Sequence, residues 1–192
     1  MHKRLFLLGL LTAAVIVGPS AGAAQAQTPI RHSLYQHYID PFTASGWYPA
    51  CTDMGVDWFV TRRLLVLAIG DVVILGFDSH DGGWPGGHFI WYQLLDGSHA
   101  GDVIYVAEHL TKLVPAGTRV RAGQRIAVAL PGGTGTEWGW AEATGATRAN
   151  PCYHEGEVTH SGREMARFMK SLGAQVQNPP GHGSDAPFGK LC

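Results

Sequence analysis

Glycine and proline divide the apolar part of this chain into short runs. The 192 residues include 26 Gly and 11 Pro. The runs Leu64–Ile69 and Val72–Leu75 flank the turn dipeptide Gly70-Asp71, and the run Phe89–Leu95 lies between a Gly-Gly pair and an Asp-Gly pair. Frequent turn residues argue against a helical bundle, whereas strand-length runs with turn signals are typical of an antiparallel β sandwich or barrel.

Further strands are predicted at Val103–Ala107, Ile126–Leu130 and Trp138–Ala141. The dipeptides Ala116-Gly117 and Ala122-Gly123 mark turns before the second of these strands. We therefore expect the segments 64–75 and 113–130 to form two hairpins that belong to one antiparallel sheet system.

Residues 161–173 are predicted to form a helix that packs on the outside of the sheets. Ser161 and Glu164 match a capping box, and Gly173 is a typical residue after a helix end. One apolar stripe follows the helical spacing i, i+3, i+4, i+7 and contains Met165, Phe168, Met169 and Leu172.

The first 26 residues have the pattern of a secretory signal peptide. Lys3 and Arg4 precede the apolar run Leu5–Gly18, and Ala24-Gln25-Ala26 matches the small-residue cleavage signal. The run is shorter than the roughly 20 residues that span a bilayer. We expect cleavage after Ala26, a secreted or periplasmic mature chain, and membrane association only through an uncleaved signal; a membrane anchor is the alternative.

The remaining chain is predicted to contain an irregular leader at 27–45, a β domain at 46–142, and a C-terminal part at 143–192 made of a loop, the helix and a Pro/Gly tail. A net charge of −1 with 15% charged residues excludes a coiled coil and does not favour a nucleic-acid partner. The three cysteines are Cys51, Cys152 and Cys192. In an exported chain they predict one disulfide and one odd thiol, with Cys152–Cys192 and Cys51–Cys152 both open.

Several motifs resemble those of the lysostaphin-type zinc endopeptidases, which cleave peptidoglycan crosslinks and have the duplicated hybrid motif fold. The hairpin sequence between Val114 and Ala127 carries two Ala-Gly turns at matching spacing. Tyr105–Leu110 resembles the Tyr-x-His-Leu strand of that family with an insertion before the histidine, Asp53–Asp57 its His-x-Gly-x-Asp element, and Thr134–Trp140 its Thr-Gly-x-His-x-His-Phe element. Biotinyl and lipoyl carrier domains share the hairpin, but this chain has no tight turn with the lysine that they acylate.

The resemblance implies a divergent site. It places Asp53 and Asp57 at two zinc-ligand positions, and it places Gly139 at the third, where no ligand is possible. His109 and Glu137 take the two catalytic imidazole positions. Zinc catalysis needs about three protein ligands and an open position, and carboxylates suit harder ions better. Zinc binding is therefore expected to be weak or absent, with a gap at Gly139 and with Asp57 hydrogen-bonded to His109 in one groove.

Tryptophans and loop histidines could also bind a ligand or a metal. Trp138 and Trp140 alternate on one strand and, with Trp84, could present ring faces to sugar or peptide; the alternative is core filling. His80 and His88, in a Gly-rich loop, could form a metal pocket with Asp57, or they could be solvated loop residues.

These observations predict a secreted cell-envelope protein that binds peptidoglycan or another envelope partner without hydrolysis. The alternative is an active zinc metallohydrolase that cleaves peptidoglycan peptides through a rearranged site of Asp57, His109 and Glu137 with His80 or His88.

Overall fold

The protein is described from a computed structural model, which covers residues 37–80, 88–132, 135–149, 153–154 and 157–177. The chain divides into two units, residues 1–31 and 32–192, and the second unit contains all of these residues. No helix in the described ranges is long and apolar enough to cross a membrane. The predicted signal peptide, Trp84, Cys152 and Cys192 lie outside the described residues.

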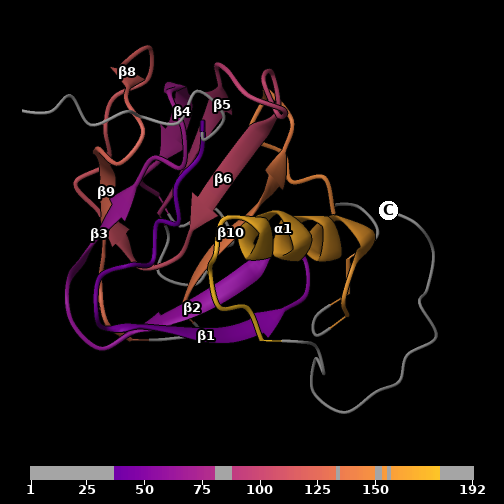
Figure 1. Cartoon of the computed structure of the whole chain (residues 1–192). Coiled ribbons are helices and arrows are strands. Elements are labelled where there is room, and N and C mark those ends of the chain that lie inside the picture. Colours follow the sequence, from indigo (N-terminus) through magenta and orange to yellow (C-terminus); the bar gives the residue numbers. More distant parts are fainter. Residues whose placement is uncertain (1–36, 81–87, 133–134, 150–152, 155–156, 178–192) are drawn as a thin grey trace, which may run out of the picture. The chain divides into compact units, whose positions relative to one another are not determined.

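The larger sheet has seven antiparallel strands in the order β1-β2-β10-β6-β5-β4-β8 (Figure 1). The strands are β1 (Trp47–Thr52), β2 (Val56–Val60), β4 (Val72–Asp78), β5 (Phe89–Leu94), β6 (Val103–Ala107), β8 (Arg119–Val120) and β10 (Thr136–Ala141). The smaller sheet has the order β3-β9-β7, with β3 (Leu64–Leu67), β7 (Leu110–Thr111) and β9 (Arg125–Ala129). The predicted mainly β, antiparallel fold with one helix is confirmed, and the two sheets do not close into a barrel.

The two predicted hairpins are wrong in their pairing. Each segment has one strand in each sheet, and the segments pair with each other: β3 pairs with β9 and β4 pairs with β8. Between these pairs, Ala68 and Gln124 continue the ladder, because the Ala68 N–H donates to the Gln124 carbonyl at 2.9 Å. The Gly70-Asp71 turn signal therefore marks a crossing between sheets, which buries Ala68 and Ile69 completely.

The main core lies between one face of the larger sheet, the smaller sheet and α1 (His160–Ser171). Trp58, Trp138 and Trp140 occupy this core, and α1 packs chiefly against β10. Residues of the leader segment contact this core. The Phe42 ring stacks on Trp58, and the Tyr38 hydroxyl donates to the Asp96 carbonyl at 2.6 Å. Residues 37–45 form no helix or strand, as expected for the leader, and they pack against the core.

Helix α1 begins at His160, one residue earlier than predicted. Thr159 is the N-cap, because its Oγ1 accepts the Gly162 N–H at 3.0 Å, while Ser161 lies buried inside the first turn. Glu164 forms an ion pair with His160 at 3.1 Å instead of completing a capping box with Ser161. The helix ends at Ser171, two residues before the predicted end, and the expected glycine, Gly173, follows the C-cap Leu172 with a φ of +97°. Met165, Phe168 and Met169 are buried as the stripe predicts.

Candidate functional site

The residues that match the endopeptidase motifs meet on three neighbouring strands. In the register of the larger sheet, Glu137 of β10 lies directly opposite Asp57 of β2 on one side and Ala107 of β6 on the other. Directly paired residues of an antiparallel sheet point to the same face. Asp57 and Glu137 therefore share the face opposite the main core, here called the acid-bearing face.

The carboxyl groups on the acid-bearing face are buried and hydrogen-bonded. Asp57 is 6% exposed and Glu137 is 4% exposed. The Cys51 thiol donates to Asp57 Oδ2 at 3.3 Å, and the Tyr105 hydroxyl donates to Glu137 Oε1 at 2.5 Å. Asp53 receives the Tyr153 hydroxyl on Oδ2 at 3.0 Å. Each predicted ligand or catalytic carboxyl thus has a protein donor.

Burial and the close spacing of the acids on this face raise the pKa values of Glu137 and Cys51. Burial, followed by the negative charges of Asp57 and Asp53, raises the pKa of Glu137 well above its usual value, against the opposing effect of the Tyr105 hydrogen bond. Burial and the charge of Asp57 likewise raise the pKa of the Cys51 thiol to about 12. Glu137 therefore holds a proton to a higher pH than an exposed glutamate does, and the Cys51 thiol stays protonated at neutral pH.

The gap expected at Gly139 is wrong, because a tyrosine ring fills it. Gly139 lies directly opposite Tyr105, and a Cβ on Gly139 would collide with the Cε1, Cζ and hydroxyl oxygen of that ring. Tyr105 is completely buried. Gly139, which has no side chain to bind zinc, thus leaves the space that the Tyr105 ring occupies, and the hydroxyl of that ring donates to Glu137.

Glycine also makes room for the carboxyl group of Glu137 itself. A Cβ on Gly55, in the middle of the Asp53–Asp57 element, would collide with Glu137 Oε1. Gly55 and Gly139 are therefore both needed by the buried Tyr105–Glu137 arrangement.

His109 lies at a bend between the two sheets. Glu108 and His109 have φ values of +70° and +49°, and they join the end of β6 to β7. A left-handed conformation at two successive residues other than glycine is uncommon. The Nε2 of His109 is buried without a hydrogen-bond partner, while Asp57 Oδ2 accepts from Cys51, so the expected Asp57 bond is not made by this nitrogen.

The donor set does not fit the zinc site that the resemblance implies. Asp53, Asp57 and Glu137 are carboxyls engaged by Tyr153, Cys51 and Tyr105, and Gly139 supplies no donor. Among the residues that the structure describes, no three His, Cys, Asp or Glu side chains form a group that could hold a metal ion. His80 carries a side chain that is 92% exposed and lies beside Asp78 rather than Asp57. His88 is partly buried, and its carbonyl accepts the Glu108 N–H.

The tryptophans of β10 fill the core. Trp138 is 0% exposed and Trp140 is 3% exposed, so neither ring offers an open face to a ligand. Trp138 packs edge-on against Trp47 and Trp58, and Trp140 stacks on His99. Their alternation does place them on one side of the strand, but that side faces α1 and the main core.

Two site residues could not be found from their sequence patterns. The sequence places Tyr105 in a strand motif and makes Cys51 a disulfide candidate, whereas Cys51 is a free thiol in the structure. Strands β1 and β2, which place Cys51 beside Asp57, were not predicted either. Nothing local in the sequence shows that Tyr105 lies opposite Gly139, because that contact depends on strand pairing.

Comparisons with known proteins give matches only among solved structures. No family model and no curated protein matches the chain. The solution structure of lysostaphin has 19% identity and a TM-score of 0.48, covering 75% of this chain and 60% of its own. The antimicrobial peptidase lysostaphin from Staphylococcus simulans has 17% identity and a TM-score of 0.46, covering 81% and 59%. Its catalytic domain, crystallised in the absence of phosphate, has 23% identity and a TM-score of 0.38, covering 62% and 88%. The chain thus spans about three fifths of the first two structures.

Proposed function

We propose that this chain is a secreted or periplasmic, non-hydrolytic relative of the lysostaphin-type endopeptidases, which binds peptidoglycan or a closely associated envelope component. The observation that carries the proposal is the Tyr105 ring, which lies over Gly139 and whose hydroxyl donates to the buried Glu137. A zinc hydrolase needs an imidazole or carboxylate where the ring lies, and it needs a metal-bound water beside a base. In this chain the same volume is filled by a buried phenol.

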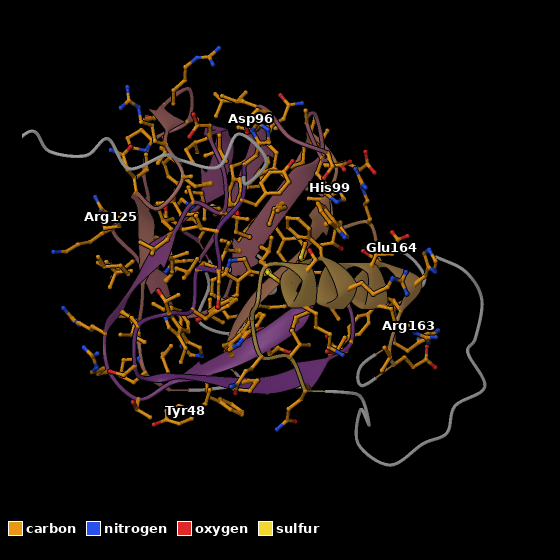
Figure 2. The ribbon with its side chains drawn as sticks, viewed as in Figure 1. Tyr48, Asp96, His99, Arg125, Arg163 and Glu164 are labelled. Carbon is orange, nitrogen blue, oxygen red and sulfur yellow. The ribbon has the colours of Figure 1, made fainter. Side chains whose placement is uncertain are left out.

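Binding would use the open end of the acid-bearing face. Tyr48 of β1 lies directly opposite Phe59 of β2, and the two side chains are 55% and 46% exposed. Phe59 is two residues from Asp57 on an unbulged stretch of β2, so it points to the acid-bearing face. In Figure 2, Tyr48 points away from α1. An exposed aromatic pair of this kind can stack on sugar rings or hold a peptide.

The proposal is tested by incubating the purified chain with insoluble peptidoglycan sacculi. We expect the chain to sediment with the sacculi, to release no soluble peptide or amine with or without added zinc, and to contain less than one zinc ion per chain. Tyr48→Ala with Phe59→Ala should weaken sedimentation. The matched control is Phe77→Ala on β4, which removes an aromatic ring of 42% exposure that lies four strands away from β2.

Three results would overturn the proposal. Zinc-dependent release of peptides with about one bound zinc per chain would show a hydrolase. Absence of sedimentation would remove the peptidoglycan partner. An equal loss of binding in Phe77→Ala would show that the Tyr48–Phe59 pair is not the contact surface.

A further inference from the structure

Positive charge is concentrated in two stretches of this chain. Residues 61–70 and 109–135 contain none of the fifteen Asp and Glu residues. They contain six of the fourteen Lys and Arg residues, which are Arg62, Arg63, Lys112, Arg119, Arg121 and Arg125. The same two stretches supply all three strands of the smaller sheet, β3, β7 and β9, together with β8. The fold therefore brings these charges to one side of a chain whose net charge is −1.

The outer face of the smaller sheet carries two apolar side chains, a threonine and flanking cations. In β3, Leu64 and Val66 are buried, while Leu65 between them is 53% exposed. Leu65 lies opposite Val128 of β9, and Val128 lies opposite Thr111 of β7, so these three side chains share the outer face.

Cations lie on both sides of Leu65 along the strand direction. Arg63 directly precedes β3, and Arg125 lies opposite Leu67 at the start of β9. The Arg125 guanidinium donates to the Lys112 carbonyl at 2.6 Å, which keeps these two residues together. Arg63, Lys112 and Arg125 are all exposed, and Figure 2 shows Arg125 on the side where β3 and β9 lie. We call Arg63, Leu65, Lys112, Arg125 and Val128 the basic face.

Among the described residues, no acid forms an ion pair with the basic face. Within the described part of the chain, none of the six cations forms an ion pair. Elsewhere, arginines do find acids: Arg148 pairs with Asp102 at 3.0 Å, and Arg167 of α1 pairs with Glu164 at 3.8 Å. Uncompensated surface cations raise the local concentration of anions, and an exposed apolar side chain among them is a feature of contact surfaces.

We propose that the basic face docks on the surface of a lipid bilayer that contains anionic phospholipid. Arg63, Lys112 and Arg125 contact headgroup phosphates, and Leu65 enters the boundary between headgroups and acyl chains. The exposed leucine favours a bilayer over a soluble phosphate polymer, because only a bilayer offers apolar volume beside the phosphates. This inference is independent of peptidoglycan binding, since it uses a different sheet.

The test uses residues 27–192, which omit the apolar signal run and keep the whole second unit of the fold. We expect this chain to sediment with vesicles of phosphatidylcholine and phosphatidylglycerol in equal parts, and not with phosphatidylcholine alone. Added salt should release it. Arg63→Gln with Lys112→Gln should lower the partition coefficient by roughly 30-fold, at about fivefold for each cation.

The control variant makes the same change of net charge on α1. Arg167→Gln with Lys170→Gln should bind within about twofold of the parent chain, because these residues lie outside the basic face. Leu65→Ser should weaken vesicle binding but leave binding to soluble polyphosphate unchanged.

Three outcomes would overturn the proposal. Equal binding to neutral and anionic vesicles would remove the role of the cations. An equal loss in the two charge variants would indicate a net-charge effect. Full vesicle binding by Leu65→Ser, with tight polyphosphate binding, would identify a soluble polyanion as the partner.

Discussion

The contact between Tyr105 and Gly139 predicts a specific coupling between the two positions. In Gly139→Ala the new Cβ would overlap the phenol ring, which is completely buried and held at its hydroxyl by Glu137. Overpacking of this kind costs about 1–3 kcal/mol of unfolding free energy. Tyr105→Ala removes a buried aromatic ring and should cost roughly 3–5 kcal/mol.

The double variant, Gly139→Ala with Tyr105→Ala, should lose less unfolding free energy than the sum of the losses in the two single variants. If the two sites did not interact, Gly139→Ala with Tyr105→Ala would cost roughly 4–8 kcal/mol. Without the ring, the alanine methyl meets no clash, so the double variant should cost about what Tyr105→Ala costs alone. The coupling energy is then about 1–3 kcal/mol, measured as a double-mutant cycle in urea unfolding followed by tryptophan fluorescence.

The control is Gly117→Ala, where a Cβ would meet nothing within 4 Å at a φ of +82°. This variant should lose only about 1–2 kcal/mol from backbone strain and add to Tyr105→Ala without coupling. Additive energies in the Gly139 cycle, within about 0.5 kcal/mol, would show that the ring does not occupy the ligand position. The same reasoning predicts that Asp53→His with Gly139→His can acquire zinc only when Tyr105 is also replaced by alanine.

Four further predictions concern protonation, packing and processing. Folded Glu137 keeps a proton that the unfolded chain releases above its usual pKa of 4.5, so the free energy of unfolding should fall as pH rises above 4.5. Glu137→Gln should lack this pH dependence. Equal pH dependence in both proteins would refute the raised pKa of Glu137. The pKa of the Cys51 thiol is raised to about 12, so Cys51 should react with iodoacetamide far more slowly in the native chain than in urea. Asp57→Asn should speed the reaction of the native chain. Both rates are measured in a chain that carries Cys152→Ser and Cys192→Ser, so that only Cys51 reacts. Tyr38→Phe removes the donor to the Asp96 carbonyl and the acceptor of the His99 N–H, so it should cost about 1–3 kcal/mol; an unchanged urea midpoint would contradict this. Amino-terminal sequencing of chain exported by a secretory host should start at or near Gln27, whereas Met1 on membrane-bound protein would indicate an anchor.

Much of the local structure was predictable from residue patterns. Strand β6 has the predicted bounds, Val103–Ala107; β5 and β10 differ from prediction at one end by one or two residues, and β9 is shifted by one residue. The helix stripe of Met165, Phe168 and Met169 is buried as expected. These features follow from side-chain periodicity and turn residues, which act within a few positions of one another. The residues of the acid-bearing face were also named from motifs, because their spacing is local.

Tertiary pairing decided what those residues can do. The segment 64–75 holds one strand of each sheet because its partner is 117–129 rather than itself, and no local signal distinguishes the two pairings. Tyr105 meets Gly139 through a register that joins positions 34 residues apart, and that contact converts an expected gap into a buried hydrogen bond. The basic face likewise exists only because β3 and β9 lie side by side, which brings Arg63, Lys112 and Arg125 to one surface. Strand partners depend on the packing of the whole core, so a pattern that determines where strands begin and end leaves their neighbours open.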